Sequence, residues 1–197
     1  MSAKIIPFPS RKGEDVQLSE AQRDIILLAA DEMIAKGGKE LLVQVLKGMR
    51  SDLVLGAEAE KLRHFGALSS LTLAGIESRI DRILEEDLLR VEHYASRALL
   101  VHSPLGWERV KPLWAAILHD SFARRAARGE LQGIYAEIGR VHREVKQLVL
   151  ERIEREGSSA LAPVLEGWRE RETKGMKRRI SEVLERLTCA SPSSSPR

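Results

Sequence analysis

The sequence of 197 residues contains one cysteine, Cys189, and few aromatic residues, which make up 4% of the chain. One cysteine excludes an intrachain disulfide and a multi-cysteine zinc site, and it fits a reducing cytoplasm. No apolar run approaches the ~18 residues that a membrane-spanning helix requires, and residues 1–15 lack the apolar segment of a secretion signal. A core with so few rings must consist mainly of Leu, Ile, Val and Ala. The sequence therefore predicts a soluble, cytoplasmic, helix-rich globular protein.

The residue patterns that carry catalysis, or that hold a metal or cofactor, are also missing. None of the five histidines lies four residues from another, as the ligands of a helical metal site do. Gly38-Lys39 is followed by Glu40 and lacks the upstream glycine of a nucleotide-binding phosphate loop. Cys189 falls near a Ser/Pro-rich end, which disfavours a nucleophilic role. We therefore expect no enzyme activity, no metal and no cofactor.

Charge is divided unevenly along the chain, although the net charge is only +3. Residues 107–187 hold 17 Lys and Arg against 13 Asp and Glu, whereas residues 1–106 hold 14 against 16. A protein that coats nucleic acid has a stronger basic excess. Any contact of the first half with nucleic acid must therefore come from a local group of cations.

Helical periodicity dominates the first 87 residues. Ser19 and Gln22 have the spacing of a capping box at the start of a first helix, and Gly37-Gly38 marks its end. A second helix is expected from Lys39 to Leu46, with Gly48 as its stop signal. Two further helices are expected to begin after the N-cap residues Ser51 and Thr72, and each is expected to pack one apolar face against the core. The apolar residues are Leu53, Val54, Leu55 and Leu62 in the helix after Ser51, and Leu73, Ile76, Ile80, Ile83 and Leu84 in the helix after Thr72.

The period changes after Asp87, where apolar residues alternate with charged ones. Leu89, Val91 and His93 alternate with Arg90 and Glu92, and residues 98–102 form a second, β-compatible run. A β-hairpin is therefore predicted with residues 94–97 at its tip. Residues 103–106 are expected to form a turn.

From Trp107 to Leu187 the pattern is helical again, with Pro112 expected at a helix start or a kink. The apolar residues from Leu131 to Leu148 step by three and four in heptad-like spacing. A basic cluster at residues 174–179 is either a solvated face or a further nucleic-acid contact. The predicted fold is mostly α, of the α+β class: a flexible arm (1–18), a winged helix with a small β-hairpin wing (19–106), an antiparallel helical domain (107–187) and a disordered tail (188–197).

Several segments of the first half occur in the order and spacing of one known family. Residues 43–51, VQVLKGMRS, are similar to a V-x-x-L-R-G-S-x-S turn, and His64-Phe65-Gly66 lies where a Tyr- or Phe-Gly pair is typical. Residues 76–89 look like a helix ending in L-I-x-E-G-Y-L, and residues 99–106 like a wing strand followed by T-x-x-G. Residues 24–106 thus resemble the RQC domain, the winged helix that follows the motor in RecQ-family DNA helicases. Because the phosphate loop is missing, the resemblance implies a DNA-binding module without helicase activity.

The first group of candidate DNA contacts lies in and after the turn. Lys47, Arg50 and Ser51 combine cations, a hydroxyl and the free amides of a helix N-terminus, which together can bind a phosphate. Lys61 and Arg63 form a second basic group before Phe65. The alternative is an ordinary capped turn with solvated charges.

The second group is the tip of the hairpin, with Tyr94, Ser96 and Arg97. In the family that the chain resembles, the wing tip often packs an aromatic or apolar residue on a terminal base pair. Tyr94 offers such a ring and Arg97 a phosphate contact, whereas a plain surface tyrosine is the alternative.

These observations predict a non-catalytic protein that binds duplex backbone, duplex ends or forks in DNA repair, replication or recombination. Residues 107–187 would contact a protein partner or a second copy of the chain, and no membrane is involved. One alternative is a sequence-specific regulator that reads bases through residues of the third helix, namely Ser69, Ser70, Thr72, Glu77 and Arg79. The other is a protein-interaction adaptor that has lost DNA binding.

Overall fold

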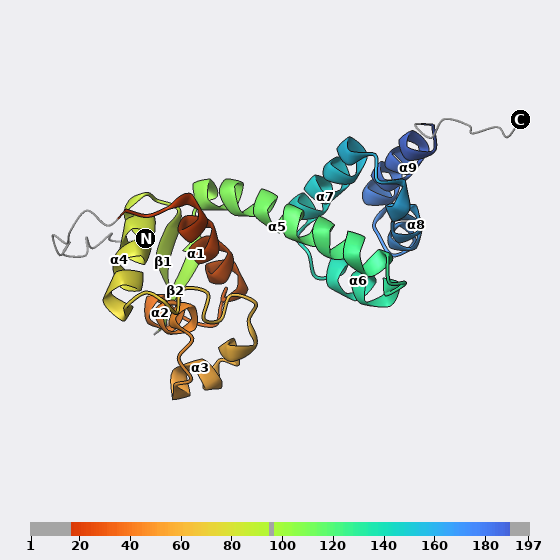
Figure 1. The fold of residues 1–197 in the computed structure, drawn as a ribbon. Coiled ribbons are helices and arrows are strands. Elements are labelled where there is room, and N and C mark those ends of the chain that lie inside the picture. The colour runs from red at the N-terminus through yellow and green to blue at the C-terminus, as the bar shows by residue number, and fades with distance from the viewer. Residues whose placement is uncertain (1–16, 95–96, 190–197) are drawn as a thin grey trace, which may run out of the picture. The chain divides into compact units, whose positions relative to one another are not determined.

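The chain divides into two compact units, Met1–Trp107 and Glu108–Arg197, called the first and second unit below (Figure 1). The computed structural model describes residues 17–94 and 97–189. Nearly all of the predicted arm and tail therefore lies outside the described residues. Within the described ranges the fold is mostly helical, with one small antiparallel hairpin, which confirms the predicted fold class.

Three helices form the core of the first unit. Ser19 caps the first one through the predicted capping box with Gln22, and Thr72 caps the third by accepting a hydrogen bond from the Gly75 N–H. Their inward faces bury aliphatic side chains such as Ile26, Leu42 and Ile80, each worth roughly 1.5–3 kcal/mol relative to exposure. The helices are α1 (Glu20–Glu32), α2 (Lys39–Lys47) and α4 (Leu73–Glu85).

The helix predicted after Ser51 is much shorter than expected. It forms α3 (Asp52–Gly56), and a 3-10 turn, η1 (Ala59–Lys61), follows it. Only Val54 of α3 is buried, so the prediction that this helix continues to Leu62 and points its leucines inward is wrong. Glu58 adopts a left-handed backbone, with φ of 51°, which ends the helix before it can extend.

The hairpin consists of β1 (Leu89–Tyr94) and β2 (Arg97–His102), paired from Leu89 with His102 to Tyr94 with Arg97. Strand β2 lies against the loop between α1 and α2: the Leu100 N–H donates to the Gly37 carbonyl at 3.3 Å. A Cβ at Gly38 would lie 2.6 Å from the carbonyl oxygen of Ala98. The double glycine therefore serves close packing of the wing. The prediction that it ends the first helix is wrong, because α1 ends at Glu32 with Met33 as its C-cap and Gly38 precedes α2 as its N-cap.

The segment after the wing begins a helix instead of forming the predicted turn. Ser103 is fully buried; its hydroxyl donates to the Asp87 carbonyl and accepts from the Gly106 N–H at 3.0 Å. Helix α5 (Pro104–Ala126) starts directly after it, eight residues before Pro112, and runs through that proline. Pro104 is the first residue of α5, a position to which proline is well suited, and this explains why the helix starts earlier than predicted.

The second unit continues α5 and adds four helices and a 3-10 turn. The heptad-like run does not form one rod, because the chain leaves the helix between Ile138 and Arg143 and starts again with His142 as N-cap. Trp168 and Phe122 are its largest fully buried side chains. The elements are α6 (Leu131–Ile138), α7 (Arg143–Glu156), η2 (Ser159–Leu161), α8 (Ala162–Glu170) and α9 (Lys174–Cys189). Within the described ranges, no helix is long and apolar enough to cross a membrane.

Candidate nucleic-acid interface

The turn between α2 and α3 is held in one shape by its backbone. Gly48 has a left-handed conformation, with φ of 81°, and its N–H reaches the carbonyls of Gln44 and Val45 at 3.0 Å. The Met49 N–H also bonds to Gln44 at 2.9 Å. This is the usual way in which a glycine ends a helix. The turn therefore presents the next side chain, Arg50, in a defined direction.

Two of the candidate residues in the turn are engaged within the protein. The Lys47 ammonium donates to the carbonyls of Ser69 at 2.7 Å and Leu71 at 2.8 Å, so it ties down the loop before α4. The Ser51 hydroxyl donates to the Gln44 side chain and accepts from the Val54 N–H at 3.3 Å. Both residues therefore shape the turn, and sequence patterns alone do not reveal the carbonyl partners of Lys47.

Arg50 is different, because its side chain is exposed and forms no ion pair within the part of the chain that the structure describes. Met49, directly before it, and Asp52, two residues after it, are both exposed. Leu53 and Leu55 on α3 are 43% and 47% exposed. The surface of the turn thus presents one cation, Arg50, beside exposed apolar side chains and one acid, Asp52.

The loop after η1 lies on the C-terminal end of α2. The Gly66 N–H donates to the Val45 carbonyl at 2.8 Å, and a Cβ at Gly48 would lie 3.0 Å from the Gly66 Cα. At the other side, Glu32 of α1 accepts from the His64 N–H at 3.2 Å, and its carboxylate also lies 3.2 Å from the His64 ring. Glu32 is a positioning residue that the sequence offered no signal to find.

The cations of this loop are exposed. Lys61 pairs with Glu58 at 2.7 Å; this hydrogen bond raises the pKa of Lys61 and lowers that of Glu58. Arg63 is exposed as well. Because the Lys61 charge is partly balanced by its own neighbour, its contact with DNA phosphate would have to displace that carboxylate.

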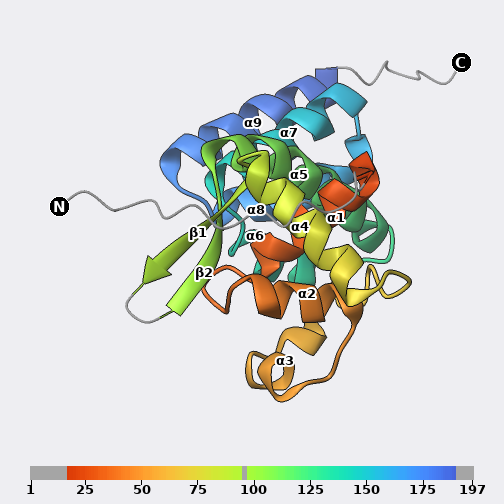
Figure 2. The same cartoon turned by 90° about the vertical axis from the view of Figure 1, so that its left-hand side faces the viewer.

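The wing presents its tip to solvent. Tyr94 is 79% exposed, and Arg97, its cross-strand partner, is also exposed and forms no ion pair with any described residue. Ser96 lies outside the described residues. Figure 2 shows the hairpin projecting to the lower left of the first unit and α3 lying at its bottom, below α2. The hairpin and α3 are thus two separate projections of the first unit.

Helix α4 carries a face of paired charges. Lys39 bonds to Glu77 at 3.1 Å and to Asp81 at 2.6 Å, and Arg79 bonds to the Gln22 side chain at 3.0 Å and to a backbone carbonyl. Thr72 caps the helix. Three of the residues proposed to read bases thus have structural partners, and the acids on this face repel phosphate. This arrangement disfavours the sequence-specific regulator.

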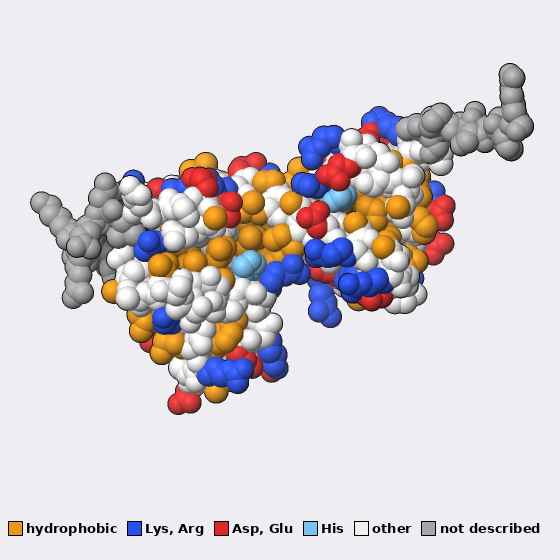
Figure 3. Space-filling view, in the orientation of Figure 1, with side chains coloured by type: hydrophobic (Ala, Val, Ile, Leu, Met, Phe, Trp, Pro, Cys, Tyr) orange, Lys and Arg blue, Asp and Glu red, His pale blue; other side chains and the backbone are white. Residues whose placement is uncertain are grey.

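The sparse cations on the surface of the first unit favour a DNA contact confined to a few residues over a broad one. Figure 3 shows mostly hydrophobic and uncharged side chains on the visible face of the first unit, with few Lys and Arg among them. No group of His, Cys, Asp and Glu that could hold a metal ion occurs among residues 17–94 and 97–189. The exposed groups of the first unit include single cations such as Arg50 and Arg97 and the Tyr94 ring.

A comparison with protein families identifies the first unit. Residues 15–112 match the RQC domain, which confirms the resemblance noted for residues 24–106. No curated protein and no solved structure matches the chain. The match ends within α5, so the helices from α6 to α9 lie outside it.

Proposed function

Residues 15–112 belong to the RQC family of DNA-binding winged helices, and from this we propose that the protein binds DNA ends or forks without catalysing a reaction. Arg50 holds backbone phosphate beside the turn, and the wing lies along the duplex or its end. The observation that carries the proposal is the RQC match, together with the exposed Arg50 in the turn and the exposed Tyr94 and Arg97 on the hairpin, which projects from the first unit (Figure 2).

Tyr94 gives the preference for ends or forks. Its ring is exposed at the wing tip, and stacking on a base is worth about 1–3 kcal/mol. Tyr94→Ala is expected to weaken binding to a fork or blunt duplex by about fivefold to hundredfold, while binding to a closed circular duplex stays unchanged. Tyr94→Phe keeps the ring and is the matched control. Equal losses on the circle and the fork would show that Tyr94 does not recognise an end.

The general test is a titration of the full chain against single strand, blunt duplex and fork at two salt concentrations. Affinity should fall as salt rises, because phosphate contacts release counterions. Unrelated duplexes of the same shape should bind equally, whereas a strong dependence on base sequence would revive the regulator. No binding to any of these DNAs at low salt contradicts the proposal.

An adaptor that has lost DNA binding is the second candidate. Met49, Leu53 and Leu55 form an exposed apolar group beside Asp52, which is a surface that a protein could cover. If Arg50→Ala and Arg97→Ala together leave DNA affinity and its salt dependence unchanged, the adaptor is favoured. Under either function we expect no ATP hydrolysis, a place in DNA repair, replication or recombination, and a cytoplasmic location.

A further inference from the structure

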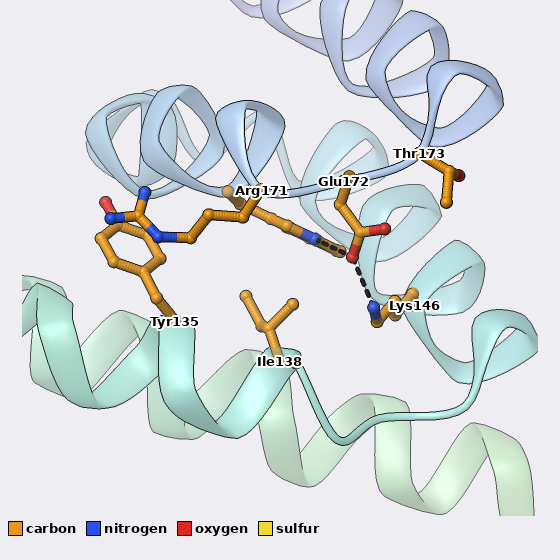
Figure 4. Close-up of a pocket in the computed structure, with 8 residues that line it drawn as sticks. Tyr135, Ile138, Lys146, Arg171, Glu172 and Thr173 are labelled. Carbon is orange, nitrogen blue, oxygen red and sulfur yellow. Dashed lines mark hydrogen bonds and ion pairs between the residues drawn. The ribbon is translucent and has the colours of Figure 1, made fainter.

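A small cavity opens in the second unit, outside the RQC match. It lies between α6, α7, α8 and the start of α9 and measures about 130 Å³ (Figure 4). Sites for drug-sized molecules are larger, at roughly 300–1,000 Å³. The size suits one aliphatic side chain. The lining residues are Tyr135, Ile138, Gly139, Lys146, Trp168, Arg171, Glu172 and Thr173.

One wall of the cavity is a partly buried carboxylate, one oxygen of which accepts two hydrogen bonds. Glu172 accepts hydrogen bonds from the Lys146 ammonium and from the Trp168 indole N–H, the latter at 2.9 Å. Burial alone would raise the pKa of Glu172, but the hydrogen bonds from Lys146 and Trp168 outweigh it and hold the pKa below its ordinary value. Because Lys146 and Glu172 balance each other, this wall does not require a charged ligand.

One face of the Tyr135 ring is covered by a side chain, and the Trp168 ring is buried. The Arg171 guanidinium lies over the Tyr135 ring, 4.4 Å from its centre, and the Tyr135 hydroxyl donates to the Pro163 carbonyl at 3.2 Å. The Trp168 side chain is almost fully buried. A nucleobase needs an open π-face to stack, so this cavity does not suit a base.

Cations lie in the cavity lining and in the adjoining first turn of α9, and one of them, Arg171, also pairs with Glu170 at 3.8 Å. Arg171 is exposed at the end of α8, and Thr173, which lines the cavity, is followed directly by Lys174. Lys174 and Lys177 are exposed and pair with no acid in the ranges that the structure covers. The first turn of α9 contains no acidic residue. The mouth therefore favours a negatively charged partner.

We infer that this cavity binds an acidic peptide segment of a partner protein, with one aliphatic side chain inside and flanking carboxylates on Arg171, Lys174 and Lys177. Charge complementarity at the rim selects the acidic sequence, and the apolar surface of Ile138 and Tyr135 selects the inserted side chain. The inference depends only on the second unit, so it does not rest on DNA binding by the first.

Fluorescence anisotropy with short labelled peptides tests the inference on the full chain. The peptides are aspartates around one leucine, the same with alanine in place of leucine, and the same with serines in place of aspartates. Leucine should bind about tenfold more tightly than alanine, since three carbons leave water. The serine peptide should bind more weakly, and its affinity should depend little on salt. Equal binding of the leucine and alanine peptides would overturn insertion into the cavity.

A pair of charge variants separates the rim from general electrostatics. Lys174→Glu with Lys177→Glu should weaken the leucine peptide by about tenfold or more and leave the affinity for duplex DNA unchanged. Arg124→Glu with Arg128→Glu makes the same change in net charge on exposed residues at the end of α5 and should have little effect. Equal losses for both pairs would overturn the site, as would absence of binding at low salt. Displacement of the peptide by single-stranded oligothymidylate would assign the rim to nucleic acid instead.

Discussion

Lys47 and Arg50 lie three residues apart, yet the structure predicts opposite results when each is replaced by methionine. The Lys47 ammonium bonds to two backbone carbonyls, of Ser69 and Leu71, and so holds the loop before α4. Arg50 bonds to no acid within the described ranges. Methionine retains much of the side-chain length in both variants while removing the charge. Lys47→Met should therefore change the fold locally, and Arg50→Met should change binding.

The expected magnitude follows from the partners of Lys47. Hydrogen bonds from a charged donor contribute about 1.5–3 kcal/mol when shielded, but the bond to Ser69 is exposed and contributes less. A total loss of about 1–2 kcal/mol corresponds to a factor of 5 to 30 in a local opening equilibrium. Amide exchange measured by NMR can detect this at Gly66 and Leu68, whose N–H groups bond to α2.

The DNA measurement gives the complementary result. Arg50→Met should reduce the slope of log affinity against log salt by about 1, as expected for one lost phosphate contact, with amide exchange unchanged. Lys47→Met should speed exchange at Gly66 and Leu68 and leave the slope close to that of the unchanged protein. The reasoning is refuted if Lys47→Met lowers the slope by one while exchange stays the same, because Lys47 would then contact phosphate and not the loop.

Two further predictions concern stability. Gly106→Ala would place a Cβ 1.8 Å from the Leu88 carbonyl oxygen, so urea unfolding should show a loss of at least about 3 kcal/mol; Gly175→Ala, with open space around its Cβ, should be neutral or stabilise slightly. Glu172 has a folded-state pKa below its ordinary value of 4.5, so its contribution to stability is present above that pH and is lost as pH falls through the folded pKa. Glu172→Gln should lower stability at pH 7 by about 2 kcal/mol and make the loss in acid shallower, as followed by Trp168 fluorescence; a parallel pH profile would contradict the Lys146 pairing.

The sequence predicted those parts of the fold that depend on residues close together in the chain. Ser19, Ser51 and Thr72 all cap helices as expected, because a cap depends on residues within one turn. The hairpin followed from one alternating run and one β-compatible run. The start of α5 was missed although part of its signal is local, since Ser103 accepts from the Gly106 N–H and Pro104 takes the first helical position. The bond from Ser103 to the Asp87 carbonyl joins residues sixteen apart. Periodicity cannot detect such a partner.

In the candidate site, too, the sequence did not reveal contacts between residues that are far apart in the chain. Residue type correctly placed exposed groups at Arg50, Tyr94 and Arg97. It could not separate Arg50 from Lys47, since the two differ only in what the chain brings beside them, namely the carbonyls of a loop more than twenty residues away. The cavity of the second unit was invisible for a similar reason: Lys146 and Glu172 lie on different elements.

The acids of the first unit limit how DNA can approach it. Glu77 and Asp81 lie along α4, and Asp52 begins α3. An acid in the first turn stabilises a helix N-terminus, but it also occupies the position where phosphate would otherwise bind. With α4 carrying paired acids and α3 beginning with its own carboxylate, we propose that a polyanion approaches the first unit at Arg50 and at Arg97 on the wing. The acidic balance of residues 1–106 is therefore compatible with DNA binding, because it confines the contact to these two cations.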